Sequence, residues 1–342
     1  MRVCSLFHPS AGAVLLAGML PIVHAATFCV DNSASLASAL ITAQSNSQDD
    51  TINVVVGTYL LGSELEYTAA SGETYTLNII GGHAPGCPGP PATSGNTVLD
   101  GQNLVRQLTI AAKGSVGLGY ITFVHGYPTL YAGGALNLVN TSSTSATYVF
   151  SNVFVANKAA DNNSGGSMYV SSQGDVHLWS NIVYANSGSA AAGYLSCDGN
   201  TYINGNTFVG NQPINHVGLG GLDITGSGHY WLANNILWNN EGYDVFDQNG
   251  SVDYAYNDIG VIGNYPPLST SHELSVDPGF TGFFGVSLAP DSPLVNAGFD
   301  NPPGGVGGCC DANHGPRVVG QHVDIGALET DVLFRNGYEP VP

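Results

Sequence analysis

One pattern of polar and apolar positions recurs along the middle of the chain. Two asparagines enclose four residues with an apolar centre, and successive copies begin 29, 25, 29 and 22 residues apart. Such an interval suits one coil of three short strands and three turns. The copies open at Asn152, Asn181, Asn206, Asn235 and, in decayed form, Asn257; the first four close at Asn157, Asn186, Asn211 and Asn240.

Alternation along a strand assigns two faces to each repeat. The second residue after the opening asparagine is apolar in every copy, so we expect it to face the core; these residues are Phe154, Val183, Phe208, Leu237 and Ile259. The first residue tolerates a hydroxyl and a carboxylate, so we expect it to face outward; this column is Val153, Ile182, Thr207, Ile236 and Asp258.

Two further strands complete each coil. One follows a pair of small residues, at Gly133-Gly134, Gly165-Gly166, Ala192-Gly193 and Gly220-Gly221. The other is a short apolar and aromatic run, as at 176–179 and 229–232. Three strands per coil, repeated, predict an all-β parallel β-helix with three faces.

The asparagines are predicted to form ladders. Identical residues stacked at about 4.8 Å can each donate a side-chain hydrogen bond to the next, and asparagine also tolerates the left-handed backbone of a tight turn. Each such bond contributes about 1 kcal/mol net, whereas an unpaired buried amide costs more, so the ladder enforces register. We prefer this interpretation to a sugar-binding row of asparagines.

Both ends of a solenoid expose strand edges that need cover. At the amino end, Leu36, Leu40 and Ala43 have helical spacing after Ser33, which predicts a capping helix within 33–44. Strands follow in 51–61, 75–82, 97–101 and 106–112, with a loop at 85–96. Beyond Asp277 the coil period breaks, so we expect an irregular cap over the far end, with Arg317 paired with Asp324 or Asp311 as a structural ion pair.

The expected organisation has five parts. They are a signal peptide at 1–25, an N-terminal cap at 26–48, the parallel β-helix at 49–276, a C-terminal cap at 277–330 and a tail at 331–342. The first part carries one Arg, an apolar run too short to span a bilayer, and a small-residue exit at Ala25. We therefore expect a secreted or cell-surface protein without a transmembrane segment.

The net charge of the chain limits the classes of molecule that it can bind. The formal net charge is −19, with 6 Lys and Arg against 25 Asp and Glu. Nucleic acid is excluded because phosphate binding needs clustered basic residues, and polyanionic sugars are disfavoured unless a cation bridges them. Acidity also keeps an exported particle soluble, so we expect a monomer.

An odd set of cysteines remains after signal cleavage, at 29, 87, 197, 309 and 310. In an oxidising compartment this set predicts at least one thiol without an intramolecular partner. Cys29 and Cys87 both lie near the N-terminal cap, so we expect a disulfide between them. Cys309 and Cys310 lack the spacing of a zinc site.

Several segments of the chain together resemble a known family. The segments SLASALITAQ, DTINVVVGTYLL and SPLVNAG, the asparagine-rich coils and GPRVVGQHVDIGALE are together similar to exported bacterial right-handed parallel β-helix repeat (PbH1) proteins that end in a choice-of-anchor Q domain. The resemblance implies a right-handed, pectate-lyase-like fold and deployment at the cell surface, and it implies no agreed activity. Right-handedness agrees with the general bias of parallel crossovers. The final DVLFRNGYEPVP resembles a short tail of exported Gram-negative proteins.

No catalytic set is recognisable. The acids, base and basic partners of polygalacturonase-like, pectate-lyase-like and alginate-epimerase-like sites are missing, as are G-x-S-x-G and H-E-x-x-H. Asp223, Asp244 and Asp247 remain as acids for an alternative reading as a polysaccharide lyase or glycoside hydrolase. No cofactor is expected. Calcium, at Asp244, Asp247, Asp253 and Asp258, is a minor alternative because no dense acidic run is present.

A ligand face is the remaining prediction. In the strands that follow the pairs of small residues, side chains alternate between inside and outside, so each coil should present one polar residue outward. These residues are Asn137, Tyr169, Ser196, Asp223 and Asp244. It would hold an extended glycan by hydrogen bonds and by stacking on Tyr169. Outward Tyr184 and Trp238 form a second candidate. The leading hypothesis is a non-enzymatic exported β-helix that binds or displays toward a glycan or another surface polymer; a carbohydrate-active enzyme and a structural or adhesin module are the alternatives.

Overall fold

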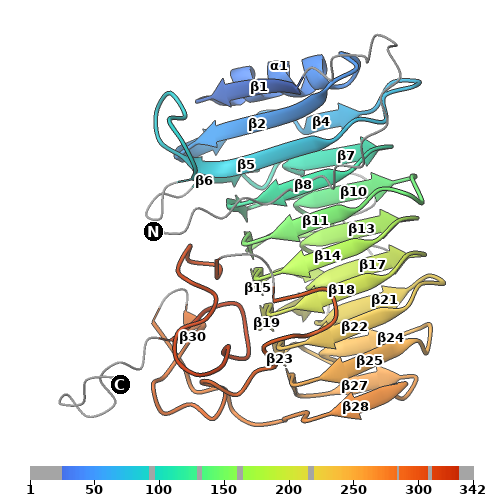
Figure 1. The fold of residues 1–342 in the computed structure, drawn as a ribbon, viewed down its shortest axis with the longest axis vertical. Helices are drawn as coiled ribbons and strands as arrows, with labels where there is room; N and C mark the ends of the chain where they lie inside the picture. Colours follow the sequence, from blue (N-terminus) through green and yellow to red (C-terminus); the bar gives the residue numbers. More distant parts are fainter. Residues whose placement is uncertain are drawn as a thin grey trace, which may run out of the picture.

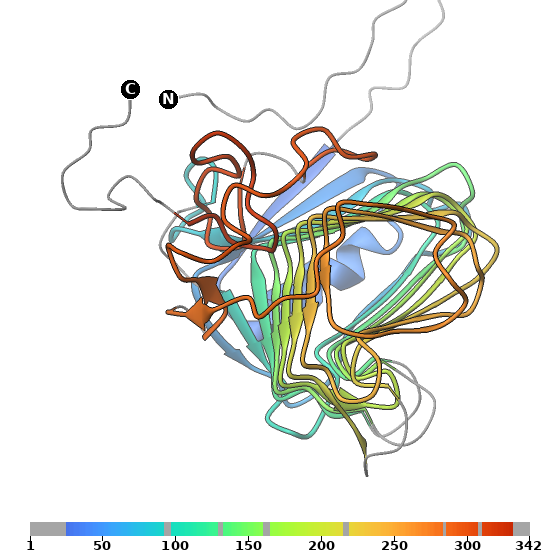
Figure 2. The same ribbon diagram turned by 90° about the horizontal axis from the view of Figure 1, so that it is seen from below.

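The chain forms a right-handed parallel β-helix (Figure 1). The computed structural model describes residues 25–91, 97–128, 133–159, 165–214, 219–282, 285–306 and 310–330. The expected signal peptide, apart from Ala25, and the tail at 331–342 lie outside the described residues. Viewed from below, successive coils superimpose on one three-sided outline (Figure 2).

Three parallel sheets make the faces of the described solenoid. Sheet A has the order β1 (Ala25–Val30), β2 (Asp49–Val55), β5 (Leu77–His83), β8 (Val116–Gly119), β11 (Thr147–Phe150), β14 (Val176–Trp179), β18 (Thr201–Asn204), β22 (Tyr230–Ala233), β25 (Val252–Ala255) and β28 (Ser269–Ser271). Sheet B has the order β3 (Gly57–Leu60), β6 (Thr97–Asp100), β9 (Ile121–Val124), β12 (Val153–Val155), β15 (Ile182–Tyr184), β19 (Thr207–Val209), β23 (Ile236–Trp238) and β26 (Asp258–Ile259). Sheet C has the order β4 (Leu65–Thr68), β7 (Leu108–Ala112), β10 (Leu136–Asn140), β13 (Met168–Ser172), β17 (Gly193–Cys197), β21 (Leu222–Thr225), β24 (Val245–Asp247) and β27 (Ile262–Asn264).

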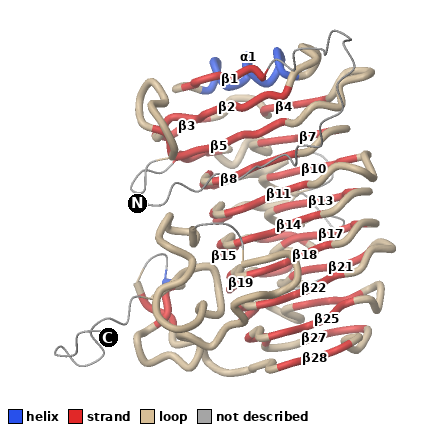
Figure 3. The backbone as a smooth tube through the Cα atoms, viewed as in Figure 1, coloured by secondary structure: helices blue, strands red, loops and turns tan. Residues whose placement is uncertain are grey.

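Two small sheets lie outside this prism. The turns contribute a parallel pair, β16 (Ser187–Gly188) with β20 (Gln212–Pro213). The C-terminal segment contributes an antiparallel pair, β29 (Phe280–Thr281) with β30 (Ser287–Leu288). Neither pair is part of the three main faces, which carry almost all strands drawn in red in Figure 3.

One helix, α1 (Ser33–Ala43), covers the N-terminal end of the described solenoid (Figure 1). Its buried residues include Leu36, Leu40 and Ala43, the positions predicted from helical spacing. The N-cap is Asn32 and not the expected Ser33, because the Asn32 side chain accepts the backbone N–H of Ser35 over 2.9 Å. In the described part of the chain, no helix is both long enough and apolar enough to cross a membrane.

The interior is filled by columns of apolar side chains in register. On sheet B, Phe154 pairs with Val183 and lies directly below Phe123, whose ring stacks on it at 4.8 Å between centroids. The inward column predicted from the repeat is buried throughout: Phe154, Val183, Phe208, Leu237 and Ile259 are at most 4% exposed. The assignment of the core face is therefore confirmed.

The asparagines form two buried ladders. Each Nδ2 donates to the Oδ1 of the asparagine in the next coil over 2.8–3.2 Å, and that Oδ1 also accepts the backbone N–H of the same preceding asparagine. The second hydrogen of Nδ2 goes to a backbone carbonyl, as from Asn206 to Leu178. The first ladder is Asn152, Asn181, Asn206, Asn235 and Asn257, and the second is Asn157, Asn186, Asn211 and Asn240. Every such amide thus has all its donors and acceptors paired, as burial requires.

The left-handed backbone lies one residue before each ladder asparagine. Ser151, Ser180 and Gly205 have φ of 51°, 52° and 61°, and Ala156 and Ala185 both have φ of 54°. This differs from the expectation that the asparagines themselves take this conformation. A left-handed residue turns the chain between sheets at a cost of about 1–2 kcal/mol without glycine, which the ladder bonds beside it offset.

The C-terminal segment is not an end cap. Residues 277–330 leave the last coil and run back along the outer face of sheet B, as the orange to red ribbon shows beside β15, β19 and β23 (Figures 1 and 2). Ile182 is buried with Val286 and Leu328 of this segment, and Ile236 with Leu294. The column Val153, Ile182, Thr207, Ile236 and Asp258 does point away from the core, but all five residues are buried.

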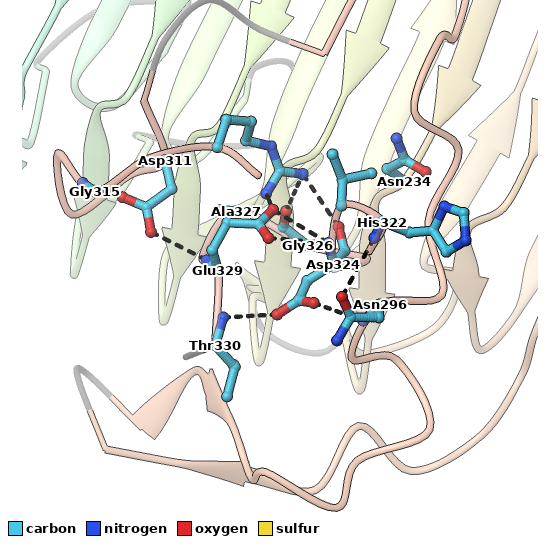
Figure 4. A network of polar contacts seen from close by, with 12 residues as sticks. Asn234, Asn296, Asp311, Gly315, His322, Asp324, Gly326, Ala327, Glu329 and Thr330 are labelled. Carbon is cyan, nitrogen blue, oxygen red and sulfur yellow. Dashed lines mark hydrogen bonds and ion pairs between the residues drawn. The ribbon is translucent and has the colours of Figure 1, made fainter. Parts of the chain in front are cut away.

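A polar network inside this segment fixes its path (Figure 4). The Asp324 carboxylate accepts the backbone N–H groups of Asn296 and Thr330, over 2.6 and 2.7 Å. The Arg317 guanidinium pairs with the Glu329 carboxylate, and both side chains are 2% exposed. The expected carboxylate partners, Asp324 and Asp311, are therefore wrong; Arg317 reaches Asp324 through its backbone carbonyl.

The segment also uses the turn before the first ladder. A Cβ on Gly205 would lie 2.5 Å from Arg317 Nη2, so only glycine leaves room for the guanidinium. One coil below, the Asn234 side chain donates to the Phe299 carbonyl and accepts the Phe299 N–H. Docking therefore depends on the identity of the left-handed residue in two neighbouring coils.

Cys29 and Cys87 form a disulfide with a Cα–Cα distance of 5.9 Å, joining β1 to the loop after β5. Cys197 is buried inside the solenoid, and Cys309 lies outside the described residues. The pairing expected from the sequence is thus present.

Removing one rung of a ladder should destabilise the fold. In Asn206→Ala, the Asn181 Nδ2 loses its acceptor and the Leu178 carbonyl loses its donor, so we expect the free energy of unfolding to fall by about 1–3 kcal/mol for each group left unpaired. Urea denaturation measures it. The exposed Asn200→Ala is the control and should change stability by less than about 0.5 kcal/mol; an equal loss in both variants would contradict the role of the ladder.

Breaking the buried ion pair should release the C-terminal segment. Glu329→Ala leaves the Arg317 guanidinium buried without its carboxylate, so we expect a loss of about 3–5 kcal/mol, and a smaller loss in the double variant Arg317→Met/Glu329→Leu. Thermal and urea unfolding of both variants test this order. His322→Ala, which breaks an exposed pair with Asp300 and leaves the Asp300 bond to the Val323 backbone intact, should cost less than about 1 kcal/mol.

Candidate functional site

The predicted ligand column on sheet C is only partly correct. Asn137 pairs with Tyr169, Tyr169 with Tyr194, and Tyr194 with Asp223, so these four residues form one outward column. Ser196 belongs to the neighbouring column, where it pairs with Ser171. The error has a clear origin: Gly165 pairs with Ala190 and not with Ala192, so the run of three alanines was aligned two residues too late.

The rings in this column stack on each other. Tyr169 and Tyr194 are nearly parallel, with centroids 5.5 Å apart, so each covers one face of the other. Asp223 is 8% exposed and accepts a hydrogen bond from Gln248 Nε2 over 2.6 Å. Its burial raises the pKa of this carboxyl, so Asp223 is not a freely solvated acid.

Asp244, the fifth predicted ligand residue, has a structural role. It is 2% exposed, and its Oδ1 accepts the backbone N–H and Nδ2 of Asn240, over 2.9 and 2.8 Å. Its Oδ2 accepts the backbone N–H of Val261. Asp244 therefore occupies the next position of the second asparagine ladder and does not face a ligand.

The second predicted candidate is also not a free surface. Tyr184 and Trp238 point outward from sheet B, but the C-terminal segment packs against both. Tyr184 joins the cluster that includes Val286 and Leu328, and Trp238 joins the one that includes Leu288. Their aromatic rings serve the docking of this segment.

Sheet A carries a row of aromatic side chains that the sequence reading missed. Tyr148, His177, Tyr202 and Trp231 pair in register on β11, β14, β18 and β22. Their centroids are 4.7, 4.8 and 5.0 Å apart, and the ring planes differ by 11°, 21° and 12°. We call these four residues the aromatic strip. The signal was present in the strands TYVF, VHLW, TYIN and YWLA, whose outward positions repeat an aromatic ring or imidazole.

The strip presents ring edges and not ring faces. His177 lies between Tyr148 and Tyr202, and Tyr202 lies between His177 and Trp231, so both faces of the two central rings are covered. All four residues remain half-buried. Because both faces of the two central rings are occupied, their exposed parts are ring edges. His177 Nδ1 is buried, so the edge groups left for a ligand are the tyrosine hydroxyls and the remaining ring nitrogens.

Carboxylates flank the strip. Asp175 influences the pKa of Tyr148, His177 and Tyr202. Burial lowers the pKa of His177 to about 4, against the opposing charge of Asp175, so the imidazole is neutral at neutral pH. Burial likewise raises the pKa of Tyr148 and Tyr202. The strip is therefore uncharged and bordered by acid.

A histidine and an aspartate border the lower end. The His229 ring lies 4.0 Å from that of Trp231, and its Nε2 is 2.8 Å from Asp253 Oδ2. Ser269 Oγ donates to the other oxygen of Asp253 over 2.5 Å. The serine contacts the carboxylate and not the imidazole, so this group does not have the arrangement of a serine nucleophile activated by histidine.

The C-terminal segment borders the other side. Asn204 Nδ2 donates to the carbonyl oxygens of Pro303 and Gly305, over 2.8 and 2.7 Å. Gly304, with φ of 79°, lies so close to Tyr202 that a Cβ would be 2.4 Å from the ring. The glycine-rich stretch thus has a packing role beside the strip.

The acids considered for catalysis or calcium are engaged elsewhere. Asp247 faces the interior in register with Ile224 and is 0% exposed, and Asp258 accepts the backbone N–H of Val276. Within the described ranges, no cluster of three or more His, Cys, Asp or Glu side chains could hold a metal ion. The acids named for the calcium and enzyme alternatives thus have structural contacts in the described fold.

Both asparagine ladders end on a carboxylate. Glu273 Oε1 accepts the backbone N–H and Nδ2 of Asn257, both over 3.2 Å, as Asp244 does for Asn240. The accepting oxygen of a carboxyl group closes a chain of donors without leaving an amide N–H unpaired, whether or not the other oxygen carries a proton. Burial raises the pKa of Glu273 to about 7 and of Asp258 to about 6.

Scans of protein-family models, curated proteins and solved structures found no match to this chain. Any function must therefore be argued from the faces described above.

The ladder ends should make stability depend on pH. Between pH 4.5 and about 7 the folded chain keeps a proton on Glu273 that the unfolded chain has lost, so the free energy of unfolding falls as pH rises through this window. Glu273→Gln keeps the acceptor and removes the charge. We expect this variant to lose less stability than the natural chain between pH 5 and pH 8 in urea denaturation, with exposed Glu66→Gln as control; identical pH profiles for all three proteins would contradict the shift.

Proposed function

We propose that this chain is an exported, non-enzymatic β-helix protein that binds a neutral glycan along the aromatic strip of sheet A. The observation that carries the proposal is the alignment of four half-buried rings, one per coil, on one face. Parallel coils repeat the same contact at the strand spacing of about 4.8 Å, which suits an extended polymer with a repeating hydroxyl pattern.

The chemistry of the ring edges favours hydroxyl groups. Phenol, indole and imidazole offer hydrogen-bond donors and acceptors on apolar bodies, the combination that enriches such residues at binding surfaces. The faces are occupied by neighbouring rings, so recognition relies on hydrogen bonds at the edges and not on stacking of a sugar ring. Asp175 and Asp253 add acceptors beside the strip.

The ligand should be neutral. Arg106 and Arg317 are buried in ion pairs with Glu64 and Glu329, and Lys113 donates to backbone carbonyls near the N-terminal end. Acids instead border the strip. A polyuronate lying on the strip would therefore meet like charge.

Export and family membership belong to the same proposal. Disulfides persist in oxidising compartments, so the Cys29–Cys87 disulfide agrees with export directed by a signal peptide at 1–25. The parallel β-helix agrees with the fold that the resemblance implies, and the choice-of-anchor Q character of 277–330 rests on its sequence. The alternatives are a carbohydrate-active enzyme and a structural or adhesin module.

Binding to a glycan array of neutral and anionic polysaccharides, followed by calorimetry, tests the proposal. Tyr148→Phe and Tyr202→Phe keep the stack and remove one hydroxyl each, so we expect affinity for a neutral glycan to fall about three- to tenfold per variant. Tyr169→Phe makes the same change in the stack on sheet C and should leave affinity unchanged.

Each other outcome has a definite meaning. Loss of affinity in Tyr169→Phe alone would move the site to sheet C. Binding to polyuronates but not to neutral glycans would overturn the chemistry, and new reducing ends or unsaturated products would show an enzyme. No binding to any glycan would leave the structural module as the better reading.

A further inference from the structure

The C-terminal end of the described solenoid has no cover. β27 and β28 are the outermost strands of sheets C and A, and all three residues of β28 are exposed. The segment that would be expected to cover them runs along sheet B instead (Figure 1). An outermost strand presents unpaired N–H and C=O groups to any extended backbone that can reach it.

The two ends of the solenoid are different. At the N-terminal end, α1 packs over the interior and buries Leu36 and Leu40. At the C-terminal end, the inward positions of the last coil reach solvent: Ile262 is 37% exposed, and Thr270 and Asn264 are exposed. Only one end can therefore extend the stack.

Apolar side chains gather at this open end. Four apolar residues in an eight-residue stretch of the last coil are exposed: Val261 (48%), Ile262 (37%), Tyr265 (51%) and Leu268 (61%). Exposed apolar residues grouped in this way mark an interaction surface more often than scattered single ones. No lysine or arginine, which often protect an edge strand, lies between 261 and 271, and the two prolines of this stretch, Pro266 and Pro267, lie between β27 and β28 and not within either strand.

We propose that two copies of this chain associate end to end through their last coils. The contact continues the coil-to-coil interface that builds the whole solenoid, and a second copy offers the same outermost strand β28 and the same exposed apolar residues. A two-fold axis perpendicular to the solenoid reverses strand direction, so β28 pairs antiparallel with β28 of the second copy. Assembly closes at two chains because α1 blocks the opposite ends.

Charge opposes this contact and makes it sensitive to salt. Asp253 and Asp277 lie in or beside the last coil, and two such ends would face each other. The net charge of −19, from which the sequence predicts a monomer, adds to this repulsion. Added salt screens the repulsion while leaving strand pairing and apolar burial intact, so dimerisation should strengthen with ionic strength.

Analytical ultracentrifugation across protein concentration and salt, with small-angle scattering of the larger species, tests the proposal. We expect a monomer–dimer equilibrium, a dimer with nearly twice the longest dimension of the monomer, and tighter association at 0.5 M than at roughly 0.05 M salt. Ile262→Asp/Leu268→Asp should be monomeric throughout. Leu104→Asp changes an equally exposed leucine (62%) far from this end and should dimerise as the natural chain does.

Three results would overturn the proposal. They are a natural chain that stays monomeric at every concentration and salt, a dimer no longer than the monomer, and a dimer that survives in Ile262→Asp/Leu268→Asp. Circular dichroism and unfolding of the variants establish that they are folded, so a monomeric variant reports on the contact.

Discussion

Buried side-chain amides in register hold this structure together. Each ladder asparagine ties the turn of one coil to the next through three hydrogen bonds, and it does so beside a left-handed residue that costs energy on its own. The strands of sheet B are only two to four residues long, so their ladders of backbone bonds are short. The asparagines supply the register that such short strands cannot fix alone.

The same constraint determines what the outer faces can do. Once coils are in register, outward residues of neighbouring coils are stacked as well, so rings at equivalent positions pack face to face. This packing stabilises the aromatic strip by about 0.5–1.5 kcal/mol per pair and leaves only ring edges for a ligand. Sheet B has its outer face buried by residues 277–330, so sheets A and C remain as the candidate binding faces.

Much of the fold could be predicted from the sequence because the residues that determine it recur at a regular spacing. The spacing of Asn152, Asn181 and Asn206 predicted the coils and the inward column correctly, because register depends on those residues. The site was less readable, since Ser196 was misplaced where three alanines hide the small pair, and Asp244 was taken as a ligand although it closes a ladder. Strand β1 was missed because it precedes the asparagine repeat and carries none of its signals, although its partner β2 is only one coil length away. The path of 277–330 was missed because its partners on sheet B are distant in sequence, and no local pattern reports such contacts.

The docked C-terminal segment also restricts how this protein can evolve. Arg317 requires Gly205, Phe299 requires Asn234, and the backbone N–H of Ala327 donates to Thr207, residues that come from consecutive coils. Most solenoids gain or lose repeats freely because each contacts only its neighbours. Here an inserted coil between the one with Gly205 and the one with Asn234 would separate contacts that a single segment makes together, so the C-terminal segment fixes the spacing of these two coils.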